Sequence, residues 1–214
     1  MLKFYYTQRS PYARKVRILL AEMQIPHDAV EISVGSFEHG SLFGEEYESM
    51  VPSLRVPAIK HNEQVIFESN AIMTYLYQLA GGDLKSDQNP PLSSSVIRPD
   101  YIWLDTMILT TIDVLLDSVI NVAAMERFGV KPADHPFLQR QLKRGQSCLD
   151  WLESKASPDG FSPGVFSVAD INLVCAVDMF EARGWFPWKG RSNLESIFEK
   201  YQGRESVRLN PLGD

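Results

Sequence analysis

The sequence predicts a mixed α/β domain followed by an all-helical domain. Three observations support this fold class. Strand-like and helix-like segments alternate over the first 80 residues, turn-forming residues cluster at 81–95, and helical periodicity alone follows in 96–214. A chain of 214 residues is long enough to bury the cores of two small domains. We therefore divide it into domains at 1–80 and 96–214, joined by a linker at 81–95.

The elements of the first domain follow from hydrophobic periodicity. Alternation of apolar and polar residues predicts strands, and apolar residues spaced three and four apart predict helices. The predicted strands cover 2–6, 29–33, 57–60 and 64–67, and the predicted helices cover 11–23 and 69–79. The order β-α-β followed by β-β-α is that of a thioredoxin-like domain.

The linker and the second domain carry different signals. Gly81 and Gly82, and then the prolines and serines of 90–95, are residues typical of turns. Apolar periodicity then predicts helices over 101–123, over 136–155, from Ser167 onward, and over 193–201. Ser167 and Asp170 have the spacing of a capping box, in which each side chain binds the other's backbone N–H, so a helix is expected to begin there.

Composition and charge limit the classes of function. Net charge is −6, and no basic stripe of the kind that binds nucleic acid is present. No stretch reads as long and apolar enough to span a membrane, and the first residues enter a strand pattern, unlike a signal peptide. The two cysteines and four histidines lack metal-ligand spacing. We expect a cytoplasmic protein without a metal, a nucleic-acid partner or a membrane partner.

Two short strings in the first domain point to a ligand with an amino-acid end. Pro57 cannot donate to a β-ladder, so it marks a strand edge where the backbone of Val56 can pair with a peptide-like ligand. Glu68 and Ser69 follow a strand and open a helix. A carboxylate can hold an ammonium group, and a serine hydroxyl with helix N-terminal amides can hold a carboxylate.

These strings, together with Ser10-Pro11-Tyr12 after the first strand and the capping box at Ser167, resemble the glutathione S-transferase family. The resemblance covers nearly the whole chain and is nearest to the cytosolic serine-type members, bacterial or theta-like. It implies a thioredoxin-like glutathione-binding domain, an all-helical second domain and a homodimer.

The resemblance also implies roles for individual residues. Val56 would pair with the cysteinyl backbone of glutathione, with Pro57 in the cis form. Glu68 and Ser69 would hold the γ-glutamyl end, and Arg55 would lie near the glycyl carboxylate. The loop at 51–55 departs from the family pattern, because it lacks the usual asparagine at its start and the glycine two residues before the valine.

Ser10 is the first candidate for activating the thiol. A free thiol titrates near pH ~8.5, so a hydroxyl donor and a helix N-terminus are needed to favour the thiolate. Ser10 is also suited to cap the helix that starts at Pro11, and the two roles are compatible. Tyr6, at the end of the first strand, is the alternative by analogy with tyrosine-type members. Because position 10 lacks a cysteine, mixed-disulfide chemistry through this residue is disfavoured.

The resemblance implies an enzyme that conjugates glutathione, as co-substrate, to a small hydrophobic electrophile in detoxification, or that reduces peroxides with glutathione. A non-catalytic glutathione-binding or regulatory protein is the alternative, and a thiol–disulfide or deglutathionylating relative is disfavoured. The residues that we expect to line the pocket for the second substrate are Gln8, Arg9, Tyr12, Met107 and Thr111.

Overall fold

The computed structural model describes residues 1–32, 43–81 and 88–213. The chain forms two compact units: Met1–Gln88 together with Glu205–Asp214, and Asn89–Arg204. The division between them falls within the predicted linker. The last ten residues differ from the prediction, because they belong to the first unit, whereas the predicted helical domain continues to the end of the chain.

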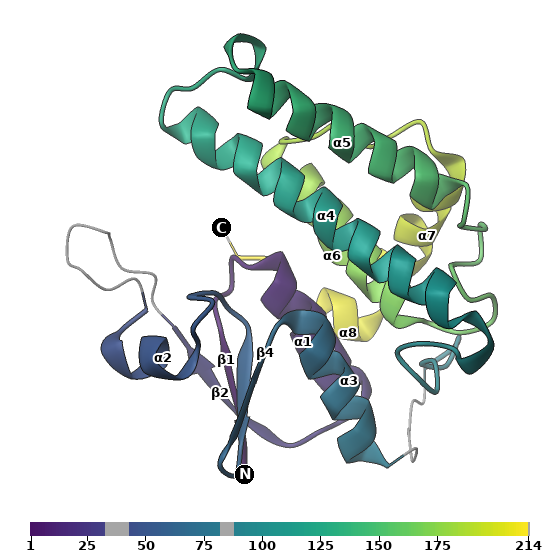
Figure 1. Ribbon diagram of the computed structural model, residues 1–214. Helices are drawn as coiled ribbons and strands as arrows, with labels where there is room; N and C mark the ends of the chain where they lie inside the picture. The colour runs from purple at the N-terminus through teal and green to yellow at the C-terminus, as the bar shows by residue number, and fades with distance from the viewer. Residues whose placement is uncertain (33–42, 82–87, 214) are drawn as a thin grey trace. The chain divides into compact units, whose positions relative to one another are not determined.

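The first unit combines a four-stranded sheet with helices, and Figure 1 shows the helices beside the sheet. Its sheet has the order β2-β1-β3-β4, in which β2 runs parallel to β1 and the remaining neighbours are antiparallel. The elements along the chain are β1 (Leu2–Tyr6), α1 (Pro11–Glu22), β2 (His27–Glu31), α2 (Glu45–Met50), β3 (Ala58–His61), β4 (Gln64–Phe67), α3 (Ser69–Ala80) and α8 (Glu205–Arg208). The predicted thioredoxin-like fold is confirmed.

Some predicted boundaries of the first unit change. The second strand begins at His27, two residues before the predicted start, and its predicted last residue, Ser33, lies outside the described residues. Helices α2 and α8 were not predicted. They have six and four residues, too few to show a helical period.

The sheet buries apolar residues on both faces. Tyr5 and Ala58 pack with Tyr47 and Val51, which belong to α2 and its C-terminal cap. Side chains alternate along a strand, so the neighbouring residues Phe4 and Ile59, a cross-strand pair, point to the opposite face. Both are fully buried. Helices α1 and α3 contact each other, and Figure 1 shows them together on the side of the sheet away from α2.

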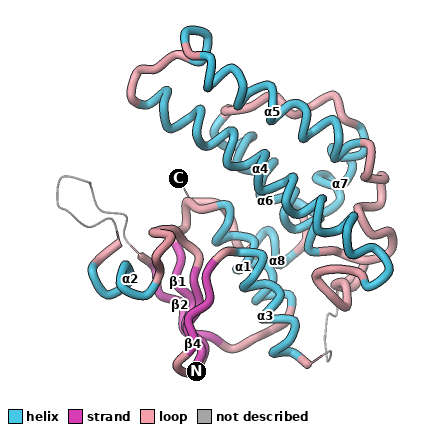
Figure 2. Tube along the Cα trace, in the orientation of Figure 1, coloured by secondary structure: helices cyan, strands magenta, loops and turns pink. Residues whose placement is uncertain are grey.

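The second unit is helical, and Figure 2 shows that the β-strands of the described residues all lie in the first unit. The main helices of the second unit are α4 (Ile102–Arg127), α5 (Pro136–Glu153), α6 (Val168–Arg183) and α7 (Ser192–Gln202), with short 3₁₀ turns at Pro99–Tyr101 and Pro132–Asp134. All four predicted helices are therefore confirmed. Twelve of the sixteen residues of α6 are buried, so this helix forms the centre of the unit.

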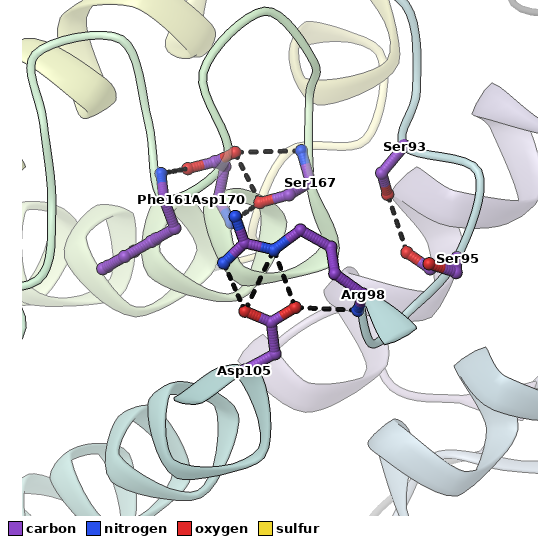
Figure 3. Close-up of polar contacts among 7 residues, drawn as sticks. All are labelled: Ser93, Ser95, Arg98, Asp105, Phe161, Ser167 and Asp170. Atoms are coloured by element: carbon purple, nitrogen blue, oxygen red, sulfur yellow. Dashed lines mark hydrogen bonds and ion pairs between the residues drawn. The ribbon is translucent and has the colours of Figure 1, made fainter. Parts of the chain in front are cut away.

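The capping box at the start of α6 is confirmed (Figure 3). The Asp170 backbone N–H donates to Ser167 Oγ at 3.2 Å, and the Ser167 backbone N–H donates to Asp170 Oδ2 at 2.9 Å. Asp170 also accepts a bond from the backbone N–H of Phe161 at 3.0 Å. Its carboxylate therefore joins the preceding loop to the first turn of the central helix.

A second polar cluster in Figure 3 joins the segment before α4 to the start of that helix. Asp105 accepts hydrogen bonds from the backbone N–H of Arg98 at 2.8 Å and from its guanidinium at 2.5 and 2.9 Å. The Arg98 side chain therefore ties the segment before α4 to the first turn of that helix.

The expectation that no stretch is long and apolar enough to span a membrane is wrong for one helix. The segment Pro99–Arg127 meets both criteria, with a mean hydropathy of 1.7. Half of its most apolar window is buried within the structure. A core helix of a globular unit satisfies the same criteria of length and composition, because one side of it packs in the core.

Candidate functional site

Strand register brings three of the predicted segments to one end of the sheet. Tyr5 of β1 lies opposite Ala58 of β3, and Ala58 lies opposite Phe67 of β4. The chain leaves β1 into the turn at 7–10, enters β3 from Val56–Pro57, and leaves β4 into Glu68–Ser69. Adjacent strands are about 4.8 Å apart, so these segments are neighbours although the first and the last lie about 60 residues apart in the chain.

The middle segment offers backbone groups at this end of the sheet. The Val56–Pro57 peptide bond is cis, as the resemblance implies. Within the described residues, neither the backbone N–H nor the C=O of Val56 makes a hydrogen bond. The Val56 side chain packs against the apolar cluster around Tyr47, and this contact holds the residue in place. Its main chain is therefore suited to pair with an extended ligand.

The atypical loop before Val56 still forms a tight turn. Leu54 has φ 50°, the left-handed conformation that glycine adopts most easily, and its N–H donates to the carbonyl of Val51 at 3.1 Å. The Tyr47 hydroxyl donates to the Arg55 carbonyl at 2.7 Å, and burial raises the pKa of Tyr47. The Arg55 side chain is exposed. The loop therefore accommodates leucine at the position where the family pattern has glycine.

Glu68 and Ser69 lie at the start of α3. Glu68 has φ 70° and ψ 120°, an unfavourable conformation for a residue with a side chain, and such residues cluster at functional sites. Its exposed carboxylate does not cap α3 and makes no hydrogen bond or ion pair to the described residues. Ser69 is buried at the first helical position. The Glu68 carboxylate thus lies beside the N-terminus of α3 without capping it.

Ser10 caps α1 at the same end of the sheet. Its Oγ accepts the backbone N–H of Ala13 at 3.1 Å, and Pro11 occupies the first helical turn. A hydroxyl that accepts one hydrogen bond still carries its own proton, so Ser10 remains able to donate. The helix contributes partial positive charge at this point. Capping and donation are therefore compatible in one side chain.

Tyr6 lies in different surroundings. Alternation along β1 directs Tyr5 into the cluster beside α2, whereas Tyr6 stacks on Phe4 with ring centroids 5.2 Å apart. The Arg17 guanidinium is 5.8 Å from the Tyr6 ring. Tyr6 lines a hollow of about 460 Å³ with residues of β2, α1 and the C-terminal segment 209–213. In the described part of the chain, that hollow is lined by neither Ser10 nor Val56 nor Glu68.

The residues predicted to line the second-substrate pocket are divided between the two units. Gln8 lines the same hollow as Tyr6, and its Oε1 accepts a bond from Arg17 at 2.6 Å. Arg9 is exposed, and the Tyr12 ring lies 4.7 Å from Lys15 Nζ. Met107 and Thr111 share a groove of about 440 Å³ between α4 and α5, which Cys148 also lines. One pocket built from all five residues remains a prediction.

The described residues contain no group of three or more His, Cys, Asp or Glu side chains placed to hold a metal ion. Cys175 is buried, as expected for a small apolar residue, whereas Cys148 is only partly buried, and desolvation raises the pKa of its thiol.

Comparison with known proteins follows the same division of the chain. The family model for the glutathione S-transferase N-terminal domain matches residues 4–84, and the model for the glutathione S-transferase C-terminal domain matches residues 136–200. Glutathione S-transferase 1 of Manduca sexta is 25% identical over 177 residues, which cover 83% of this chain and 76% of the relative.

Solved structures share the fold over the whole chain. A glutathione S-transferase from Methylobacillus flagellatus KT with glutathione bound has a TM-score of 0.78 at 20% identity, with both chains covered completely. One from Methylobacterium radiotolerans, in complex with glutathione sulfonate, has a TM-score of 0.77 at 20% identity, covering all of this chain and 96% of the other.

The two family models together match more than half of the chain, in the order and at the positions of its two units. The chain belongs to the glutathione S-transferase family of transferase enzymes.

Proposed function

We propose that the protein transfers the thiolate of glutathione to a small hydrophobic electrophile, using the site at the shared end of β1, β3 and β4. The observation that carries the proposal is the convergence, set by strand register, of Val56–Pro57, Glu68–Ser69 and Ser10. The neighbour structures with glutathione or glutathione sulfonate bound support glutathione as the ligand.

Binding would use groups at the shared end of β1, β3 and β4. The exposed Glu68 carboxylate would hold the ammonium of the γ-glutamyl group, and Ser69 with the α3 N-terminus would hold its carboxylate. The backbone of Val56 would pair with the cysteinyl residue, and Arg55 would face the glycyl carboxylate. The unfavourable backbone of Glu68 supports a functional role for this position.

The chemistry requires the thiol to release its proton to solvent before the sulfur attacks. The Ser10 O–H would donate to the sulfur, and the α1 N-terminus would add partial positive charge, so both would lower the thiol pKa. The sulfur lone pair then forms a bond to the electrophilic carbon. In a substitution the leaving group departs with its electron pair, and in an addition the product takes up a proton.

Calorimetric titration of glutathione tests the site. We expect binding to wild-type protein, and loss of about tenfold or more in affinity in Glu68→Ala combined with Ser69→Ala, because two charge-assisted contacts are removed. Glu63→Ala is the matched control, since this exposed carboxylate lies in the β3–β4 turn at the other end of the sheet. A folded wild-type protein that binds no glutathione would overturn the proposal.

Measurement of turnover distinguishes a transferase from a non-catalytic glutathione-binding protein. Conjugation of a panel of electrophiles, lost in Ser10→Ala but retained in Tyr6→Phe, would support thiol activation by Ser10. Loss in Tyr6→Phe alone would assign that role to Tyr6. Binding of glutathione without turnover of any electrophile or peroxide would favour the non-catalytic alternative.

We also propose a homodimer acting in cytoplasmic detoxification, on the family's pattern. Helix α4 supports a second copy as partner, because Trp103, Met107 and Val114 are exposed on it at helical spacing, with Trp103 79% exposed. Sedimentation equilibrium should give a dimer for wild-type protein and a weaker one for Trp103→Glu. A wild-type monomer at all concentrations would contradict this.

A further inference from the structure

The segment after the second unit folds back along α1. The Arg14 guanidinium donates from Nε to the Asn210 carbonyl at 2.7 Å and from Nη2 to the Val207 carbonyl at 3.4 Å. Ser206 Oγ forms a short hydrogen bond with Glu22, and both side chains are buried. Two buried charged residues of α1 therefore anchor α8 and the nearby Asn210.

Beyond Asn210 the segment reaches the turn between β1 and α1. Gly213 N–H donates to the Gln8 carbonyl at 2.9 Å. Arg17 Nη2 lies between the Pro211 carbonyl at 2.8 Å and the Gln8 carbonyl at 3.5 Å, and Arg17 Nη1 donates to Gln8 Oε1. Gln8 is therefore held through both its main chain and its side chain.

The approach at Gly213 is close enough to require glycine. A Cβ added there would lie 2.6 Å from Gln8 Cβ and 3.2 Å from the Gln8 carbonyl carbon. Such separations are below van der Waals contact, so a larger residue would displace either the C-terminal segment or the turn. The hydrogen bond from Gly213 to Gln8 joins main chain to main chain, so no rotatable side-chain bond lies between the two segments.

The same turn carries Ser10. The Ser10 backbone N–H donates to the Thr7 carbonyl at 3.3 Å, and its side chain caps α1 at Ala13. Gln8 lies between Thr7 and Ser10, so its main-chain position limits where the Ser10 hydroxyl can point. The glutathione-binding candidates Val56, Glu68 and Ser69 belong to other segments, and within the described part of the chain residues 211–213 make no hydrogen bond to them.

We propose that residues 211–213 form a C-terminal strap that positions the Ser10 hydroxyl for thiol activation, with Arg17 as the positioning residue. This inference rests on the proposed function. Removing the strap should misplace the O–H donor while leaving the groups that bind the γ-glutamyl end in place. Displacements of about 1 Å are enough to lower a rate by up to about a hundredfold.

Two truncations isolate the strap. A chain ending at Gly213 retains the Gly213 N–H and the Pro211 carbonyl. A chain ending at Asn210 loses both, yet keeps acceptors for Arg14 in the Val207 carbonyl and in the terminal carboxylate of Asn210. Arg17→Met removes the guanidinium that donates to Pro211 and Gln8. Arg17→Lys retains a charge and one donor group, so it should restore part of the activity.

We expect the chain ending at Asn210 and Arg17→Met to lower kcat about tenfold or more, with the KM for glutathione within about threefold of wild type. The pKa of the bound glutathione thiol, followed by thiolate absorbance against pH, should rise in both variants and stay unchanged in the chain ending at Gly213. An unchanged thiol pKa and kcat in the chain ending at Asn210 would overturn the proposal.

Hydrogen exchange of the glutathione-free protein separates this inference from the proposed function. Amides of Gln8, Arg9 and Ser10 should exchange faster in the chain ending at Asn210 than in the chain ending at Gly213, while amides of β3 and β4 remain protected. Equal exchange at these three amides would refute the strap even if glutathione binds. Faster exchange in a protein that binds no glutathione would retain the strap and reject its role in catalysis.

Discussion

Asp170 provides a test of how burial and hydrogen bonding compete at one carboxylate. It is fully buried, and desolvation raises its pKa from an ordinary value of 3.8 to about 6, although bonds from Ser167 and Phe161 act in the opposite direction. The folded chain therefore holds a proton on Asp170 over a range of pH in which the unfolded chain has already lost it.

The sign and size of the effect follow from that difference. Because the folded pKa is the higher one, the contribution of Asp170 to stability is fully present below about pH 4 and is lost as pH rises through about 6. The shift is about two pH units at about 1.4 kcal/mol each, so the free energy of unfolding should fall by about 3 kcal/mol across this range.

Asp170→Asn removes the titration, and Asp100→Asn, which removes an exposed carboxylate in the same unit, controls for net charge. Urea unfolding at several values between about pH 4 and 7 gives the comparison. All four tryptophans belong to the second unit, so their fluorescence reports the unit that contains Asp170.

Relative to wild type, Asp170→Asn should gain about 3 kcal/mol in unfolding free energy between the acidic and the neutral end of the series, while Asp100→Asn should stay parallel to wild type. A difference that does not vary with pH would refute the reasoning. A change of the opposite sign would mean that the hydrogen bonds to Asp170 from Ser167 and Phe161 outweigh its desolvation.

Three further substitutions test local features. Leu54→Gly should leave the free energy of unfolding equal to wild type or up to about 1 kcal/mol higher, and Leu54→Val should lower it by about 1–2 kcal/mol. The reason is that φ 50° suits glycine and opposes β-branching. Equal unfolding free energies for the two variants in urea titrations would contradict this. Asp105→Ala should lower the unfolding free energy by about 2–3 kcal/mol, since the Arg98 N–H and guanidinium lose their acceptor, and an unchanged fluorescence midpoint would exclude it. Ser10→Ala should cost about 1 kcal/mol of stability through the lost cap of α1, measured by thermal unfolding with Thr111→Ala as a half-buried control without a capping role.

Local patterns predicted the long elements because their signals lie within a few residues. The alternation at Leu2–Tyr6 and Gln64–Phe67 and the spacing of Ser167 and Asp170 match the strands and the capping box of the structure. Helices α2 and α8 escaped prediction because one or two turns show no period. The return of the C-terminal segment had no signal either, since Arg14 and the Asn210 carbonyl that it binds are 196 residues apart.

The candidate site divides in the same way. The sequence itself pointed to an amino-acid ligand through the types and order of Val56, Pro57, Glu68 and Ser69. The charge of a carboxylate and the hydrogen-bonding capacity of a hydroxyl or an unpaired backbone group follow from the residue type alone. No pattern indicated that Leu54 and Glu68 take positive φ, because tertiary packing rather than local preference holds a residue in such a conformation.

Thus the sequence by itself determined the two-part fold class, the long elements, and the chemical groups available for binding and for thiol activation. Only the tertiary structure decided that the segments around Ser10, Val56 and Glu68 meet at one end of the sheet, because strand pairing sets the register between residues distant in the chain. It also decided that Tyr5 faces α2 while Tyr6 faces Arg17, and that residues 211–213 hold the turn before Ser10. These outcomes depend on contacts between distant segments rather than on neighbouring residues.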